Sequence, residues 1–160
     1  MTKLNSYLSL IRFYNPIGFW LLLWPGLWGL FLSDNFNIEN FTIVVLGSFL
    51  TRSLGCAIND FLDKDFDKSV ERTKNRPIAS KELSLSEAGI FIILLACVCI
   101  FLLLQTNPYT IKLVSYIAIP MIILYPLMKR FLAMPQLFLG ATFGLSLPIS
   151  YYIAESSLSL

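Results

Sequence analysis

The sequence predicts an all-α protein, a multi-pass transmembrane bundle of about five helices. Of its 160 residues, 56% are hydrophobic and only 14% are charged, whereas a soluble domain carries about 25% charged residues. Several uncharged runs approach the length of about 20 residues that a helix needs to cross a bilayer. We therefore expect the lipid bilayer as the surroundings of the chain, and no nucleic-acid partner.

The predicted helices follow the apolar runs, near residues 13–33, 40–67, 88–111, 113–128 and 131–154. The first run is too long for the h-region of a signal peptide, about 7–15 residues. Trp24, Pro25 and Trp28 in its middle are also poor neighbours for a cleavage site. The second run contains Arg52 near its end, and we expect its helix to continue two turns beyond Ile58.

Lys and Arg are distributed unevenly over the predicted connections. The N-terminus carries Lys3 and Arg12, and the connection after the first helix has neither residue type. The connection after the second helix is the richest, with Lys64, Lys68, Arg72, Lys74, Arg76 and Lys81. Cytoplasmic loops of membrane proteins carry the excess of Lys and Arg. We therefore expect a protein of the bacterial inner membrane whose N-terminus and charged stretch face the cytoplasm.

The stretch "NDFLDKDFDKSVERTKNRP", residues 59–77, concentrates charge in an otherwise apolar chain. On a continuing helix, Asp60, Asp63 and Asp67 stand at i, i+3 and i+7 and share one face. Asn59 falls in the same arc, as does Arg52 two turns earlier. Neighbouring carboxylates repel one another, so this face needs a cation.

Mg²⁺ suits such a face because it takes oxygen ligands, usually protein carboxylates together with water and substrate phosphates. Arg72, Lys74 and Arg76 follow directly. Guanidinium groups bind phosphate oxygens bidentately, whereas a lysine acts as a point charge. Carboxylates, a metal and cations at a membrane surface indicate a diphosphate with an apolar tail as the ligand.

A solvated cytoplasmic loop is the alternative interpretation, with its Lys and Arg serving only to set the topology. A calcium loop does not fit, because Lys68 and Lys74 occupy the positions that require Gly and Glu. We expect Asp65, which points away from the other aspartates, to be solvated and outside the site.

Four segments of the chain resemble the UbiA-type membrane prenyltransferases. "NDFLDKDFDKSVERTKNRPIAS" is similar to their first Asp-rich motif, Asn-Asp-x-x-Asp-x-x-x-Asp followed by Arg-Thr-x-Asn-Arg-Pro. "YNPIGFWLLLWPGLW", "RSLGCAIND" and "YPLMKRFLAMPQLFLGATFG" resemble the 4-hydroxybenzoate polyprenyltransferase branch, which serves ubiquinone biosynthesis. The resemblance covers nearly the whole chain.

The resemblance implies a Mg²⁺-dependent transfer of a polyprenyl group from polyprenyl diphosphate to 4-hydroxybenzoate or a similar aromatic acceptor. It implies that the metal is held by Asn59, Asp60, Asp63 and Asp67, the three aspartates being catalytic. Substrate binding would fall to Asn59, Arg52, Arg72, Arg76, Tyr125 and Arg130, with Lys129 as a further catalytic residue. Lys129 and Arg130 equally fit a positive-inside anchor.

The family has about nine helices and a second Asp-rich motif, whereas no Asp follows Asp67 here. The resemblance therefore covers the N-terminal part of a prenyltransferase domain, residues 1–160. Two interpretations stay open. A separate C-terminal fragment completes the enzyme, or the chain is a non-catalytic remnant that at most binds diphosphate in the membrane.

Overall fold

The computed structural model describes residues 2–131 and 134–155, and the side chains of residues 126–131 and 135 lie outside this description. The chain divides into two compact units. Unit 1 comprises Met1–Gly18 and Leu50–Cys99, and unit 2 comprises Phe19–Phe49 and Ile100–Leu160. Because α3 and α5 contribute residues to both units, each unit is built from segments that are distant in the sequence.

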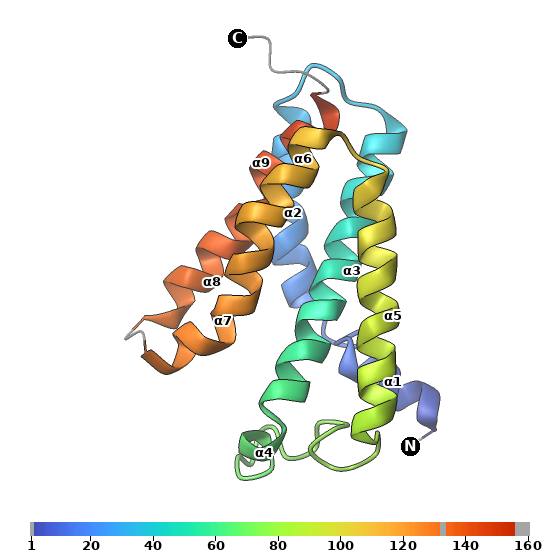
Figure 1. Ribbon diagram of the computed structural model, residues 1–160, viewed down its shortest axis with the longest axis vertical. Helices are drawn as coiled ribbons and strands as arrows, with labels where there is room; N and C mark the ends of the chain where they lie inside the picture. Colours follow the sequence, from blue (N-terminus) through green and yellow to red (C-terminus); the bar gives the residue numbers. More distant parts are fainter. Residues whose placement is uncertain (1, 132–133, 156–160) are drawn as a thin grey trace. The chain divides into compact units, whose positions relative to one another are not determined.

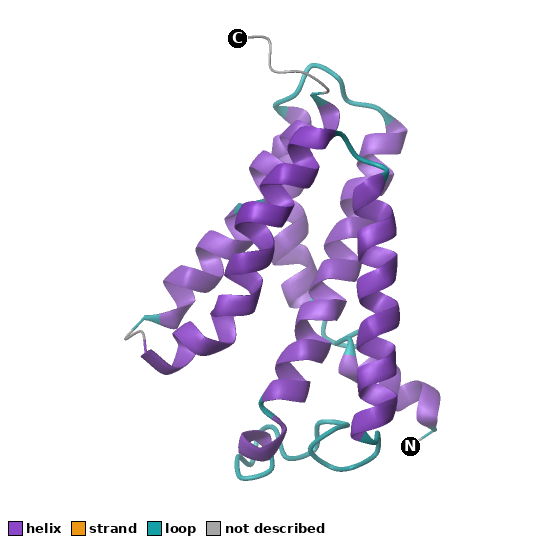
Figure 2. Cartoon of the chain, viewed as in Figure 1, coloured by secondary structure: helices purple, strands orange, loops and turns teal. Residues whose placement is uncertain are grey.

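The described residues form helices joined by turns and loops, without a strand (Figures 1 and 2). In chain order the helices are α1 (Lys3–Leu10), α2 (Ile17–Phe31), α3 (Ile38–Leu62), α4 (Lys64–Asp67), α5 (Leu85–Leu104), α6 (Pro108–Leu113), the π-helix η1 (Val114–Ala118), α7 (Ile119–Phe131), α8 (Pro135–Gly144) and α9 (Ser146–Ala154). The predicted all-α class is confirmed.

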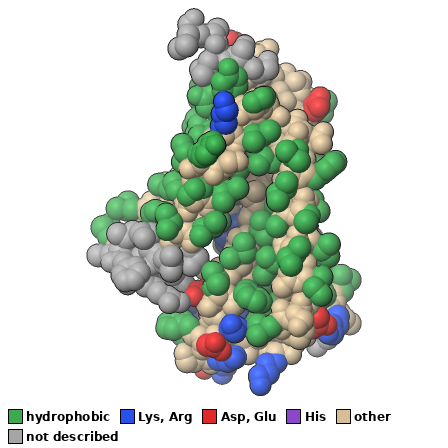
Figure 3. Space-filling view, viewed as in Figure 1, with side chains coloured by type: hydrophobic (Ala, Val, Ile, Leu, Met, Phe, Trp, Pro, Cys, Tyr) green, Lys and Arg blue, Asp and Glu red, His purple; other side chains and the backbone are tan. Residues whose placement is uncertain are grey.

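Four segments are long and apolar enough to cross a membrane: Ile38–Leu62, Leu85–Leu104, Pro108–Tyr125 and Gln136–Ala154. The first predicted helix is also present, but at 15 residues α2 is shorter than these spans. Hydrophobic side chains cover the helices on the face seen in Figure 3. This pattern suits a lipid solvent, which favours an apolar exterior.

The predicted boundary between the third and fourth helices, at Lys112, was wrong. Helix α5 ends at Leu104, and α6 begins at Pro108. The side chain of Asn107 accepts a hydrogen bond from the Thr110 N–H at 2.9 Å, and a proline follows at the first helical position. This cap and proline start a helix by satisfying or removing free N–H groups, and the Lys112 charge does not interrupt it.

The second predicted helix, 40–67, was also too long. It ends at Leu62, and Asp63 lies at φ −90° and ψ 6° before the short helix α4. Aspartate competes with the backbone for hydrogen bonds and so favours helix ends. Backbone hydrogen bonds from Asp63 to Asn59 and from Asp67 to Asp63 keep the helical turns going on either side. The predicted 131–154 helix is likewise divided, into α8 and α9.

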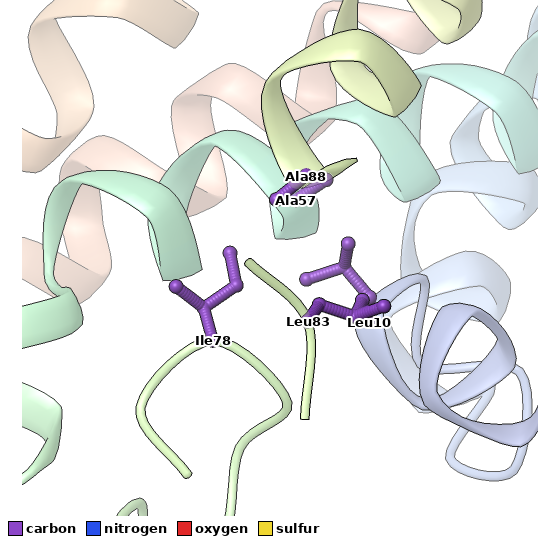
Figure 4. Packing of buried hydrophobic residues seen from close by; sticks show 5 residues of the cluster. All are labelled: Leu10, Ala57, Ile78, Leu83 and Ala88. Atoms are coloured by element: carbon purple, nitrogen blue, oxygen red, sulfur yellow. The ribbon is translucent and has the colours of Figure 1, made fainter. Parts of the chain in front are cut away.

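Unit 1 has its own hydrophobic core, formed by Leu10, Ala57, Ile78, Leu83 and Ala88 (Figure 4). These residues come from α1, α3, the loop after α4, and α5. Helix α1, which the sequence analysis did not predict, contributes a fully buried leucine. Burying such a side chain stabilises a fold by about 1.5–3 kcal/mol.

Polar contacts add to the attachment of α1. Ser6 Oγ donates a hydrogen bond to Glu82 at 2.8 Å, and Lys3 forms an ion pair with Glu87. Together with the buried leucine, these contacts hold α1 against the first turn of α5 and the loop that precedes it. The chain leaving α1 is therefore fixed in position.

Unit 2 has a second core of Leu23, Leu30, Val44 and Ala154. The α2 and α9 backbones approach closely there. A Cβ added at Gly29 would collide with the Leu147 carbonyl oxygen and with Ser150 Oγ. A glycine is therefore needed at this position for its missing side chain.

Candidate functional site

Four charged side chains form one ion-pair network in unit 1. Arg12 Nη2 donates to both carboxylate oxygens of Asp60, at 2.7 and 2.8 Å. Arg76 Nη1 donates to Asp60 Oδ1 at 3.0 Å and to Asp67 Oδ2 at 2.8 Å. Asp60 is 1% exposed and Asp67 is 4% exposed. Two buried carboxylates are thus neutralised by two arginines.

Such neutralisation is a physical requirement for these aspartates. An ionised carboxylate taken out of water costs several kcal/mol unless it is paired and hydrogen-bonded. The two guanidinium groups lie nearer the surface, with side-chain exposures of 22% for Arg12 and 24% for Arg76. The network therefore has an inner acidic layer and an outer basic layer that solvent can reach.

Arg12 is placed by the end of α1. The helix finishes at Leu10, and Arg12 follows with a φ of 59°. This left-handed conformation is uncommon for a bulky residue. It turns the side chain back, so that Nη1 donates to the Ser9 carbonyl at 3.3 Å while Nη2 binds Asp60.

Arg76 is placed by the loop that follows α4. Thr73 Oγ1 donates to the Asp67 carbonyl at 3.1 Å, and the Arg76 N–H donates to the Thr73 carbonyl at 3.0 Å. The next residues, Pro77 and Ile78, are buried. The sequence between Asp67 and Ile78 therefore folds into a rigid turn that returns the arginine to the aspartates.

The other predicted acidic residues divide as the helical spacing indicated. Asp63 is buried at 7% exposure, and Asn59 is partly buried. Asp65 is exposed and pairs with Lys68 at 2.9 Å. The hydrogen bond from Lys68 and its charge lower the pKa of Asp65. The prediction that Asp65 is solvated and apart from the buried aspartates is confirmed.

The predicted arginines have different environments. Arg52 is partly buried, and its guanidinium lies where a side chain on Gly18 would stand. Arg72 is exposed and makes no hydrogen bond or ion pair within the described part of the chain. The exposed Lys74 pairs with Glu71 at 2.6 Å. Arg76, in contrast to these residues, pairs with both Asp60 and Asp67.

The fit of a metal to this site depends on the arginines. Among the described residues, no three acidic or cysteine side chains are grouped so that they could hold a metal ion. The donors nevertheless have the chemistry that Mg²⁺ takes, namely carboxylate oxygens and an amide oxygen. They suit the ion once a guanidinium group gives up the carboxylate oxygens that it occupies.

The remaining predicted residues belong to unit 2. Tyr125 is partly buried in α7. Lys129 and Arg130 fall within the same helix, but their side chains lie outside the described residues. Their roles in binding stay predictions.

Arg12 is the residue that the sequence analysis missed. The sequence indicates it only as part of the positive charge at the N-terminus. Its partner Asp60 is 48 residues away, so no local spacing connects the two. One signal in the sequence could have indicated it. Arg12 lies shortly before α2, and two consecutive antiparallel helices bring the start of the first close to the end of the second, where Asp60 lies.

The sequence is similar to those of known membrane prenyltransferases. A profile of the UbiA prenyltransferase family matches residues 22–160. Among curated relatives, a 4-hydroxybenzoate octaprenyltransferase of Polynucleobacter asymbioticus is 44% identical over 93% of this chain and 52% of its own length. Proteins of the same description from Vibrio atlanticus and Pasteurella multocida are 44% and 43% identical, over 94% and 99% of this chain and 53% and 55% of their own.

A solved structure described as "Structural and mechanistic insights into the biosynthesis of Digeranylgeranylglyceryl phosphate synthase in membranes" is also similar. It superposes with a TM-score of 0.78 at 27% identity, covering 94% of this chain and 53% of that one. The chain thus spans about half the length of the proteins it matches. With its four candidate membrane spans, it is an integral membrane protein that belongs to the UbiA prenyltransferase family.

Proposed function

We propose that the chain is part of a membrane transferase that moves a polyprenyl group from polyprenyl diphosphate to 4-hydroxybenzoate. The observation that carries this proposal is the buried Asp60–Asp67 pair bridged by Arg76 at the end of a candidate membrane span. Such a site presents oxygen ligands and guanidinium groups beside an apolar helix. A diphosphate with a hydrocarbon tail has matching chemistry at each end.

Asp60, Asp63, Asp67 and Asn59 would hold Mg²⁺ in this proposal. The bound metal would supply positive charge to the diphosphate oxygens, where negative charge develops as the allylic C–O bond breaks. Arg76 and Arg72 would bind further diphosphate oxygens and keep the leaving group in place, and Arg52 would add positive charge nearby. The diphosphate departs with the electrons of the C–O bond, and the allylic carbon bonds to the ring carbon ortho to the phenol oxygen. That ring carbon then loses its hydrogen as a proton.

The acceptor side of the site would use residues of α7. Tyr125, Lys129 and Arg130 are the candidates for binding the aromatic carboxylate or the departing diphosphate, because a carboxylate pairs best with a guanidinium or ammonium group. The curated relatives that act on 4-hydroxybenzoate by name support this choice of acceptor. A bacterial inner membrane, with the Asp-rich loop on the cytoplasmic side, is the location we infer.

Complete activity would require the half of the relatives' length that these 160 residues do not span. The chain spans about half the length of its curated relatives, and the second Asp-rich motif expected of the family is absent from its 160 residues. We propose a separate C-terminal fragment as a partner that would supply this half. Without that partner, the second candidate function is binding of a prenyl diphosphate without transfer.

Prenyl transfer in membranes that lack their own activity tests the proposal. The chain is expressed alone and together with the second half of the Vibrio atlanticus relative, and is supplied with Mg²⁺, octaprenyl diphosphate and labelled 4-hydroxybenzoate. We expect product that disappears with Asp60→Ala or on chelation of Mg²⁺. Asp65→Ala is the matched control, because Asp65 is exposed and outside the buried network.

The two arms separate the candidate functions. Product from the chain alone would show that its own helices suffice. Product only on co-expression would support the partner. No product in either arm, with correctly inserted protein that still binds prenyl diphosphate, would leave the binding function and exclude the transferase.

A further inference from the structure

We propose that Arg12 couples the binding of the metal to the binding of the diphosphate. Its guanidinium group holds Asp60 before the ligands bind, and moves to a diphosphate oxygen when the cation takes Asp60. This inference rests on the proposed function and concerns the order in which the same site is filled.

The charges of the ion-pair network balance one another. Asp60 and Asp67 supply two negative charges, and Arg12 and Arg76 supply two positive ones, all joined by contacts of 2.7 to 3.0 Å. A group of four charges that sums to zero attracts a free divalent cation weakly. A cation must also replace a guanidinium group at oxygens that are already occupied, so free metal should bind poorly.

Both arginines contact the Asp60 carboxylate, but Arg12 covers more of it. Arg12 Nη2 lies against both oxygens of this carboxylate, so Arg12 must shift before a cation can contact either one in its present place. Arg76 contacts one of the same oxygens but is also bonded to Asp67. If Arg76 leaves Asp60, Asp67 still holds it. Arg12 is thus the group whose movement frees Asp60.

The surroundings of Arg12 explain why its movement would be short. Its Nη1 is bonded to the Ser9 carbonyl, which belongs to the anchored helix α1. The guanidinium group is partly exposed, whereas the Asp60 carboxylate is buried. A diphosphate arriving from solvent would therefore meet Arg12 before Asp60. As a planar group with several N–H donors, Arg12 can exchange a carboxylate for a phosphate oxygen without losing its hydrogen bonds.

Reciprocal coupling follows from this exchange. A diphosphate that takes Arg12 leaves Asp60 with less positive charge, and so strengthens metal binding. A metal at Asp60 releases Arg12 and strengthens diphosphate binding by the same factor, because linkage between two ligands is symmetric. The metal and diphosphate should therefore bind together, and neither should bind tightly alone.

Replacement of Arg12 separates this role from a purely structural one. Arg12→Asn is the informative variant, because asparagine adopts a positive φ more readily than most residues and so preserves the turn. We expect the variant to bind Mn²⁺ alone more tightly, since Asp60 has lost a competing cation. We expect its affinity for magnesium pyrophosphate to fall about tenfold or more, the effect of one lost charge-assisted hydrogen bond.

The experiment uses the full chain in lipid nanodiscs. Free Mn²⁺ is followed by electron paramagnetic resonance, and magnesium pyrophosphate binding is followed by calorimetry. Lys68→Gln is the matched control, because it removes one positive charge that pairs with the exposed Asp65. We expect both affinities of this control to stay at the wild-type value. Arg12→Lys keeps the charge but not the planar group. Its affinities for Mn²⁺ and for magnesium pyrophosphate should lie between those of the wild type and of Arg12→Asn.

Opposite changes in the two affinities of Arg12→Asn support the coupling. A loss of both affinities would assign Arg12 a structural role, and unchanged affinities would assign it none, so either result overturns the inference. Wild-type chain that binds no magnesium pyrophosphate would overturn the proposed function as well. Wild-type binding with an unaffected Arg12→Asn variant would overturn the coupling alone.

Discussion

A single nitrogen of Arg76, Nη1, bridges Asp60 and Asp67, with hydrogen bonds of 3.0 and 2.8 Å. The two aspartates stand on different helices, because α3 ends at Leu62 and α4 begins at Lys64. The bridge therefore joins two carboxylates across the break between α3 and α4.

Arg76→Gln should therefore loosen the site and weaken the fold. Two buried carboxylates would lose a charged partner, and we expect the free energy of unfolding to fall by about 1–3 kcal/mol. Thermal unfolding in detergent and calorimetry with magnesium pyrophosphate are the measurements. Lys74→Gln is the control, since its exposed pair with Glu71 should contribute less than about 1 kcal/mol. Equal effects of the two substitutions would contradict the bridging role.

Gly29→Ala should destabilise unit 2. A Cβ at this position would collide with the Leu147 carbonyl oxygen and Ser150 Oγ, and overpacking of this kind costs about 1–3 kcal/mol. Gly140→Ala is the matched control, because a Cβ there has open space. Removing a glycine from a helix should stabilise the chain by about 0.5–1 kcal/mol. Opposite shifts in the unfolding midpoint are expected, and shifts of the same sign would refute the close approach of α2 and α9.

Leu10→Ala should release α1 from unit 1. Leu10 is fully buried, and truncating a buried leucine costs about 2–5 kcal/mol. We expect faster hydrogen exchange in α1 and weaker binding of magnesium pyrophosphate, because Arg12 follows directly. Leu4→Ala, on the exposed side of the same helix, should change neither. If exchange in α1 were the same in both variants, the anchoring of α1 by Leu10 would be refuted.

Asn107 has two contacts that can be tested separately. Its side chain accepts from the Thr110 N–H at 2.9 Å and donates to the Tyr152 carbonyl. Asn107→Ala removes both contacts, and loss of the cap alone costs about 0.5–2 kcal/mol. Asn107→Asp keeps the cap and loses the donor. Its thermal unfolding midpoint should therefore lie between those of Asn107→Ala and the wild type. A variant Asn107→Asp that is no more stable than Asn107→Ala would show that the cap contributes little.

The fold and the acidic half of the site could be predicted from local patterns. Apolar runs located the membrane-spanning segments. The spacing of Asp60, Asp63 and Asp67 set these three aspartates apart from Asp65, and all three are buried in the structure. Arg76 was included because it follows in the same motif. Each of these features depends on residues that are close in the sequence.

The features that escaped prediction depend on capping or on distant contacts. Charge placed a helix boundary at Lys112, although Asn107 and Pro108 carried the capping signal. Helix α1 is only eight residues long and is held by the buried Leu10 and by pairs with Glu82 and Glu87. Contacts made between distant segments leave no periodic trace in the sequence, and the Arg12–Asp60 pair is of this kind.

The Arg12–Asp60 pair has a topological consequence. Arg12 precedes α2, and Asp60 lies in the last turn of α3. Because the two side chains are in contact, the segment that contains α2 and α3 begins and ends on the same side of the membrane. Whichever surface receives the N-terminus during insertion also receives the Asp-rich loop. Reporters fused before Lys3 and inserted near Lys81 should therefore always label the same side of the membrane.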